Sequence, residues 1–127
     1  MTPLFRKLNL GTRARVHVLD APASFEPELA ALAAGGVEVA RTLARPCGFA
    51  LAFAVTRAQL DRTSAALAAA CAGDVPLWLA YPKGTSKAYR CEFNRDSGWD
   101  VLAAAGFEPV RMVAIDADWS ALRFRRV

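Results

Sequence analysis

The sequence predicts an α/β fold: a small Rossmann-like three-layer domain with a mostly parallel sheet and a C-terminal antiparallel hairpin. Short apolar runs of strand length alternate with longer runs of helical period, which is the pattern of βα units. Two of the short runs, residues 47–55 and 75–81, are almost continuously apolar, as strands covered on both faces are. The 127 residues have the usual size of one domain, so we expect residues 1–127 to form a single domain.

In the first part of the chain, residues 15–20 (RVHVLD) are predicted to form the first strand. Ser24 is expected to cap a helix that Gly35 ends. A short second strand is predicted at residues 37–41. The following segment, 42–46, is too short for a crossover helix, so this strand either pairs antiparallel or is joined to the next strand by an extended strap.

From residue 47 onward, the sequence predicts four more strands and two helices. A central strand at 47–55 is followed by a capping box, Thr56 with Gln59, that opens a helix over 57–72. The remaining elements are a strand at 75–81, a helix at 98–105 opened by a Ser97–Asp100 capping box and closed by Gly106, a strand at 109–115, a turn at 116–118 and an antiparallel strand at 119–126.

Composition and charge restrict the possible classes of function. Hydrophobic residues make up 54% and charged residues 22%, which excludes a disordered chain, and no apolar run is long enough to span a bilayer. The N-terminus lacks the pattern of a secretory signal, so we expect a cytoplasmic protein without membrane contact. A net charge of +4 favours an anionic partner, but the basic residues are scattered and no nucleic-acid-binding module is recognisable. Nucleic acid is therefore not the expected partner, and the oligomeric state is not indicated.

The cysteines and the single histidine give no sign of a metal site. Three widely spaced cysteines support neither a disulfide framework nor a CxxC-type metal site, and His17 is the only histidine. Cys47 and Cys71 stand in apolar stretches and are expected to pack as small hydrophobic residues. Cys91, beside Arg90, is the one cysteine whose thiol the neighbouring charges could activate.

The polar stretch after the strand at 75–81 is the predicted ligand site. Ligands of open parallel sheets bind beyond the carboxyl ends of the strands, and the loop at 82–87 (PKGTSK) follows such an end. Its amide and hydroxyl groups lie between two lysines, and the helix expected after Ser97 adds free N–H groups at its N-terminus, which suits an anion. The candidate ligand-binding residues are Lys83, Gly84, Thr85, Ser86, Lys87, Arg95, Asp96 and Asp116.

The lysines of this loop are unusual within the chain. Among 16 basic residues only Lys7, Lys83 and Lys87 are lysines, and two of these three flank one triplet. Lysine is a compact point charge whose pKa burial can lower, which suits phosphate anchoring or amine chemistry. The alternative is an exposed loop whose lysines only keep the protein soluble, and both explanations stay open.

Several other residues have structural explanations as well. Arg95 and Asp96 either position a ligand or pair with each other, and Asp116 is either a general base or a backbone acceptor in its own turn. Trp99 is expected to pack the predicted helix onto the sheet, and His17 to be a hydrogen-bonded core residue.

Signals of dinucleotide cofactors are missing. The turn after the first strand reads APAS instead of GxGxxG, no acidic residue ends the second strand, and the Walker spacing is not met. These features argue against NAD and leave the cofactor unassigned.

Several segments resemble a bacterial family of short proteins that is classed as a domain of unknown function. The matching features are YPKGTSK, NRDxxW and IDxxWSALRFR, and the resemblance covers most of the chain and is densest from Leu77 onward. It implies a fold but no activity. The layout is also similar to a reduced methyltransferase-like Rossmann domain that ends in a hairpin.

Two functions follow from these observations. The preferred one is a non-catalytic or regulatory module that binds a small anionic or phosphorylated ligand, or an acidic partner, at residues 82–99. The alternative is a transferase-like enzyme, a degenerate methyltransferase-like one, in which Lys83, Lys87 or Asp116 acts as acid or base.

Overall fold

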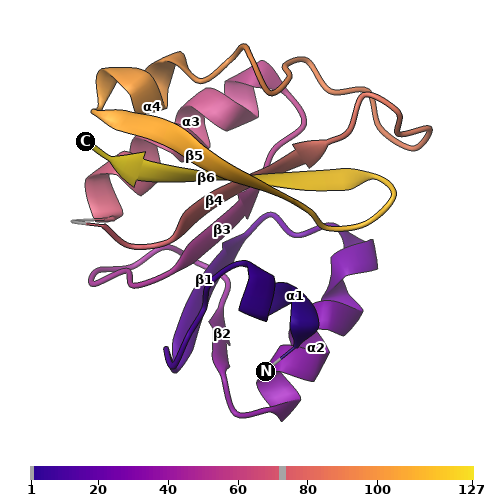
Figure 1. The fold of residues 1–127 in the computed structure, drawn as a ribbon, viewed down its shortest axis with the longest axis vertical. Coiled ribbons are helices and arrows are strands. Elements are labelled where there is room, and N and C mark those ends of the chain that lie inside the picture. Colours follow the sequence, from indigo (N-terminus) through magenta and orange to yellow (C-terminus); the bar gives the residue numbers. More distant parts are fainter. Residues whose placement is uncertain (1, 72–73) are drawn as a thin grey trace.

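A six-stranded sheet lies between two layers of helices in the computed structural model, which describes residues 2–71 and 74–127 (Figure 1). The strand order is β2-β1-β3-β4-β6-β5; the first four strands are parallel, and β6 pairs antiparallel with both β4 and β5. This confirms the predicted Rossmann-like α/β fold with its C-terminal hairpin. In chain order the elements are α1 (Pro3–Lys7), β1 (Arg15–Leu19), η1 (Ala23–Phe25), α2 (Glu26–Ala34), β2 (Glu38–Ala40), β3 (Ala50–Phe53), α3 (Arg57–Ala70), β4 (Leu77–Pro82), α4 (Asp100–Ala104), β5 (Phe107–Ala114) and β6 (Trp119–Arg126).

The two faces of the sheet bury separate hydrophobic clusters, which makes three layers. Helices α1 and α2 cover one face, where Leu51 and Phe53 of β3 pack with residues such as Phe5 and Leu29. Helices α3 and α4 cover the other face. Because side chains alternate along a strand, β3 contributes to both clusters, and every residue of β3 and of β4 is buried. The two almost continuously apolar runs of the sequence are therefore the central strands, as predicted.

The second strand is parallel, which settles the direction that the sequence left open. Glu38 to Ala40 pair with Arg15 to His17 of β1, and β3 lies on the other side of β1. The chain between β2 and β3 contains no helix and crosses as an extended strap. The buried His17 holds this strap through a hydrogen bond between its Nδ1 and the carbonyl of Thr42, 3.0 Å long, so His17 is a core residue as expected.

The predicted cap at Ser24 is wrong. Pro22 begins a 3₁₀ turn in which the Phe25 N–H donates to the Pro22 carbonyl at 2.9 Å, and α2 starts only at Glu26 without a side-chain cap. The Phe25 ring is buried against Phe53, with ring centroids 5.0 Å apart. This buried ring favours the tighter turn over a regular helix start. The helix ends before Gly35, as predicted.

The start of α3 follows the sequence prediction closely. The Thr56 hydroxyl oxygen accepts the Gln59 N–H at 3.1 Å, as in a capping box. In a capping box the Gln59 side chain would accept the N–H of Thr56, but here it accepts the N–H of the preceding residue, Val55. The helix ends at Ala70, and the predicted extension to residue 72 lies outside the described residues. Helix α1 was not predicted, although Thr2 at its N-cap followed by Pro3 is a recognisable start signal.

The C-terminal hairpin has the predicted turn, and β6 has the predicted bounds. β5 is longer than expected and forms the edge of the sheet, with an irregular register between Pro109 and Arg111. Proline is tolerated in edge strands and at register irregularities, and Pro109 stands at both. No helix within residues 2–71 and 74–127 has both the length and the apolar character needed to cross a bilayer.

Candidate functional site

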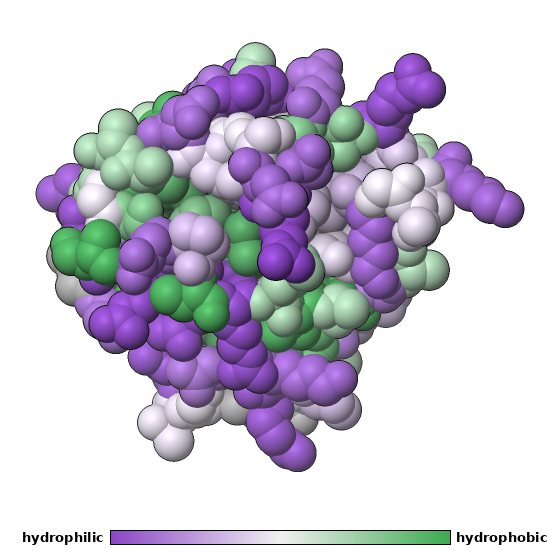
Figure 2. All heavy atoms as spheres, turned by 45° about the horizontal axis from the view of Figure 1, so that its top comes forward, coloured by the Kyte–Doolittle hydropathy of each residue, from purple (hydrophilic) through white to green (hydrophobic). Residues whose placement is uncertain are grey.

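A cavity of about 760 Å³ opens at the carboxyl end of β4. Its lining includes the loop that carries the predicted site, which lies at the upper right in Figure 1. Its volume lies in the range typical of small-molecule sites. We call it the β4 cavity; it is lined by residues 81–86, 89–95 and 97, together with Met112 of β5 and Ser120 of β6. In Figure 2, which brings this side of the molecule forward, hydrophilic residues surround separate hydrophobic patches and no continuous apolar face is visible.

Hydrogen bonds to the hairpin turn hold the first part of the loop. The Lys83 N–H donates to the Asp118 carbonyl at 2.7 Å, and the Ser86 hydroxyl donates to Asp118 Oδ1 at 2.8 Å. The Ser86 oxygen also accepts the N–H groups of Ala88 and Tyr89, each at 3.2 Å. The Ser86 hydroxyl therefore shapes the loop.

The predicted site residues divide into two groups. Lys83, Gly84, Thr85, Ser86 and Arg95 line the β4 cavity, whereas the lining does not include Lys87, Asp96 or Asp116. Asp96 borders a smaller neighbouring cavity of about 430 Å³ with Arg95 and the β5 residues 109–112. Asp116 Oδ1 accepts the N–H groups of Asp118 and Trp119 at 2.8 and 2.9 Å, which is the turn-forming role considered for it.

The expected helix N-terminus after Ser97 is wrong. Helix α4 begins at Asp100, has only five residues and has no side-chain cap. Ser97 instead closes a tight turn with Asn94, through backbone hydrogen bonds of 3.3 and 3.4 Å and a side-chain bond of 3.2 Å. Gly98, with φ of +107°, redirects the chain out of this turn, and the backbone is not helical until Asp100. A helix of five residues has only a small dipole and attracts an anion weakly.

An aromatic cluster surrounds Trp99, the last residue of the loop between β4 and α4. Trp99 packs against Tyr81, Phe93 and Phe124, with ring centroids 5.1 to 5.6 Å apart. Its indole N–H donates to the carbonyls of Asn94 and Arg95 at 2.9 and 3.1 Å. Trp99 is thus a packing residue, as predicted.

Two titratable groups in the cavity are kept protonated by burial. Burial raises the pKa of Tyr81 above its usual value, and its hydroxyl donates to Met112 Sδ at 3.3 Å. Burial also raises the pKa of the Cys91 thiol, because desolvation disfavours the thiolate. Burial thus outweighs the neighbouring charges that could have activated the Cys91 thiol.

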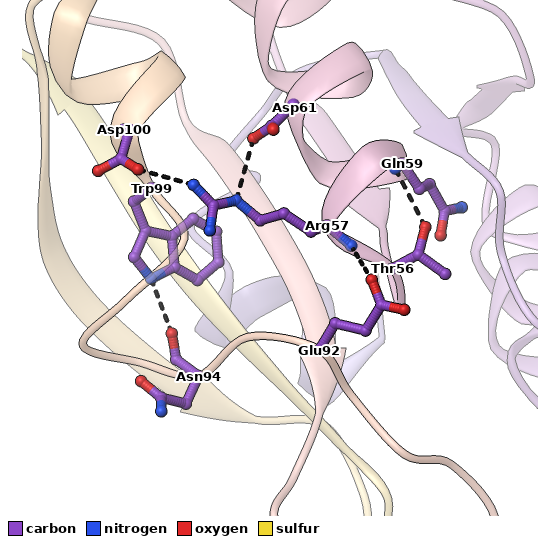
Figure 3. Close-up of polar contacts among 8 residues, drawn as sticks. All are labelled: Thr56, Arg57, Gln59, Asp61, Glu92, Asn94, Trp99 and Asp100. Carbon is purple, nitrogen blue, oxygen red and sulfur yellow. Dashed lines mark hydrogen bonds and ion pairs between the residues drawn. The ribbon is translucent and has the colours of Figure 1, made fainter.

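Glu92, which lines the β4 cavity, is hydrogen-bonded to the start of α3 (Figure 3). The Arg57 N–H donates to Glu92 Oε1 at 2.8 Å, and the Glu92 N–H donates to the Val55 carbonyl at 3.1 Å. The Arg57 guanidinium pairs with Asp100 at 2.7 Å and with Asp61 at 3.4 Å. Arg57 thus joins the first turn of α3 to the loop and to α4.

At the carboxyl ends of β1 and β2, polar side chains are held by hydrogen bonds to α2 and α3. Arg41, directly after β2, forms two hydrogen bonds of 2.6 and 2.8 Å with the carboxylate of Glu26 at the start of α2. These bonds lower the pKa of Glu26. Asp20, directly after β1, has φ of +58° and accepts from the Gln59 amide at 3.5 Å. We call this region the β1–β2 edge.

Sequence reasoning missed two sets of cavity residues, one inside the polar segment 82–99 and one on the C-terminal hairpin. Tyr89, Glu92 and Phe93 stand within the predicted segment, and their aromatic and acidic character was a visible signal. Met112 and Ser120 reach the cavity from the hairpin, and no local pattern indicates that contact.

Comparisons with known proteins reveal a shared fold. No family model matches the sequence, so the resemblance to a family of short bacterial proteins stays an expectation, and no curated protein matches either. Among solved structures, N,N-8-amino-8-demethyl-D-riboflavin dimethyltransferase (RosA) from Streptomyces davawensis is 19% identical, with a TM-score of 0.57 over 94% of this chain and 51% of its own. The pyocyanin biosynthetic protein PhzM is 16% identical, with a TM-score of 0.58 over 96% of this chain and 52% of its own. LepI in complex with SAM is 14% identical, with a TM-score of 0.54 over 98% of this chain and 39% of its own.

These likenesses agree with the expected methyltransferase-like layout. The chain spans about half the length of the first two structures, and at such low identity the likeness shows the fold. It also overturns the preferred function, the non-catalytic anion-binding module. The fold matches that of a dimethyltransferase over nearly the whole chain, which favours the transferase-like alternative.

Proposed function

We propose that this chain is a transferase-like enzyme of the methyltransferase fold that binds its small-molecule ligand in the β4 cavity. The proposal is carried by the cavity of about 760 Å³ at a strand end of a fold that a dimethyltransferase shares over 94% of this chain. LepI, on the same fold, has been solved with SAM and with SAH. S-adenosylmethionine is therefore the methyl donor to test first.

The β1–β2 edge does not fit a nucleoside cofactor. Rossmann folds hold such a group with a glycine turn after the first strand and an acidic residue near the end of the second. Here Asp20, Ala21 and Pro22 form the turn, and Arg41 stands at the end of β2, already paired with Glu26. A donor bound by this chain must find its contacts elsewhere.

The β4 cavity offers groups that recognise a flat ring and an acidic group. Lys83, Arg90 and Arg95 line it and attract a carboxylate, while Glu92 attracts an ammonium group. The rings of Tyr89 and Phe93 lie along the same lining and can contact a planar group. The proposed ligand is therefore a small organic molecule with a planar ring and at least one acidic group.

Two cavity residues are placed to bind and orient that ligand. The hydrogen bond from the Lys83 N–H to the Asp118 carbonyl fixes the backbone of Lys83 at the end of β4, and with it the position of its Cα. Tyr81 stays protonated because burial raises its pKa, and its present acceptor is a thioether sulfur, which is a weak acceptor. A ligand oxygen can replace that sulfur, so Tyr81 serves as a hydrogen-bond donor.

Titration calorimetry with SAM and with SAH tests the proposal. We expect saturable binding to the full chain, weakened about tenfold in Lys83→Met, because a hydrogen bond to a charged group contributes about 1.5 kcal/mol or more. Lys7→Met, which removes an exposed lysine from the last turn of α1, is the matched control and should bind as the wild type does. The formation of SAH from SAM in the presence of small aromatic acids, followed by mass spectrometry, tests transfer itself.

Two outcomes would contradict the proposal in different ways. If neither SAM nor SAH binds and no transfer occurs, the transferase function is wrong. If binding persists in Lys83→Met and is lost in Glu26→Gln, the function stands and the ligand lies at the β1–β2 edge instead.

A further inference from the structure

Two cysteines far apart in the sequence touch each other in the fold. Cys47 lies on the strap just before β3, and Cys71 is the C-cap of α3. Their sulfur atoms are 3.4 Å apart, and the side chains are only 5% and 1% exposed. A disulfide requires about 2.0 Å between the sulfurs. Cys47 lies outside any helix or strand and Cys71 caps a helix end, so a small backbone shift can close that gap.

Neighbouring arginines hold the two segments together. The guanidinium of Arg45, on the strap, donates to the carbonyl of Ala69 in the last turn of α3. From the end of β6, Arg126 donates to the carbonyls of Ala68 and Cys71, each at 3.3 Å. The contact between the sulfurs is thus part of a tied junction between strap, helix and sheet.

A further cavity borders one of the two cysteines. It has a volume of about 710 Å³ and is lined by residues 45–48, Ala69, Ala70 and Val75. The lining includes Cys47 and does not include Cys71. This cavity lies at the amino end of β3, on the opposite edge of the sheet from the β4 cavity.

The electrostatics assign different roles to the two thiols. The hydrogen bond from Cys71 lowers the pKa of Cys47, although burial acts in the opposite direction. The same hydrogen bond and burial raise the pKa of Cys71. Since the thiolate is the reactive form of cysteine, Cys47 is the better nucleophile and Cys71 the residue that responds second.

We propose that Cys47 and Cys71 form a modification site, a dithiol that a hydroperoxide oxidises to a disulfide. The thiolate of Cys47 attacks one oxygen of hydrogen peroxide, the O–O bond breaks, and the product is a sulfenic acid with release of hydroxide, which takes up a proton. Cys71, deprotonated as it attacks, forms the S–S bond and displaces the sulfenic oxygen as water. In sum, two thiols and one peroxide give a disulfide and two waters: the sulfurs lose two electrons and the peroxide gains them. The site does not depend on the proposed transferase function.

Oxidation of the full-length reduced protein tests this proposal. After a few equivalents of hydrogen peroxide, thiol titration in denaturant should fall from three thiols to one, and peptide mapping without reductant should link Cys47 to Cys71. Dithiothreitol should restore all three thiols. Cys91→Ser is the matched control and should form the same disulfide.

Single variants separate the two roles. In Cys71→Ser, we expect Cys47 to stop at the sulfenic acid, which dimedone traps; in Cys47→Ser, we expect Cys71 to stay reduced under the same conditions. The proposal is overturned if the wild-type protein keeps three thiols, or if Cys91 is oxidised while Cys47 and Cys71 stay unlinked. Because the mapping uses the wild-type chain, a variant that fails to fold does not remove the test.

Discussion

The carboxyl ends of β4 and of β1 lie on the same side of one sheet, but β4 leads into the lining of a cavity, whereas β1 leads into a turn that buries Phe25. After β4 the chain makes a long excursion, residues 83–99, before the next helix begins at Asp100. After β1 it turns within residues 20–22 into a 3₁₀ turn and α2, and Phe25 fills the space beneath. The difference teaches that, on this fold, the length of the connection and the side chains that fill it decide where a ligand can bind.

The two regions are also held together by different interactions. The turn after β1 is stabilised by apolar burial, with the Phe25 ring 5.0 Å from Phe53 and 6.2 Å from Phe5. The loop after β4 depends on hydrogen bonds, such as those of Ser86 to Asp118 and of Arg57 to Glu92. We therefore expect the β4 cavity to respond to changes of polar groups and backbone freedom that the β1–β2 edge tolerates.

The largest effect is expected from Gly98→Ala. Gly98 has φ of +107°, and an added Cβ would lie 2.7 Å from the Cβ of Phe93, so both strain and a clash arise. We expect a loss of about 3 kcal/mol in the free energy of unfolding, measured by urea denaturation. Gly84→Ala, in the same loop, is the control; an added Cβ meets nothing within 4 Å there, and the change should stay within about 0.5 kcal/mol. Equal effects of the two substitutions would contradict the role given to Gly98.

A smaller effect is expected from Ser86→Ala. The hydroxyl donates one hydrogen bond and accepts two, so its removal should cost about 1 to 2 kcal/mol and leave the N–H groups of Ala88 and Tyr89 without their acceptor. Hydrogen exchange of these two amides should become faster. Thr85→Ala, which removes a hydroxyl from the exposed neighbouring residue, is the control. If exchange at both amides is unchanged in Ser86→Ala, the loop is held by other contacts.

The smallest effect is expected from Arg41→Gln at the β1–β2 edge. Hydrogen bonds from Arg41 lower the pKa of the exposed Glu26 in the folded state, so their stabilising contribution is present above the unfolded pKa of about 4.5. It is lost as the pH falls through the lower folded value. The Tm of wild type and variant should therefore differ slightly at pH 7 and coincide at strongly acid pH, and high salt should reduce the difference at pH 7. A Tm difference that grows on acidification would contradict this assignment.

Much of the fold could be predicted because its signals are local. The apolar runs of β3 and β4, the Thr56 cap and the bounds of β6 follow from residues a few positions apart, since side-chain period and capping act over one or two turns of chain. The same reasoning located the polar loop at the end of β4. It failed at Ser97, where a competing turn with Asn94 and the left-handed Gly98 took the place of the expected helix start.

What only the tertiary structure decided depends on residues far apart in the sequence. Local patterns do not reveal that β2 pairs parallel with β1, that Met112 and Ser120 complete the β4 cavity, or that Cys47 meets Cys71. Each of these contacts forms only when the strands have paired and the helices have packed on them. The sequence by itself therefore determined the strands, helix α3 and the polar loop after β4, and packing between distant segments decided the cavity and the cysteine pair.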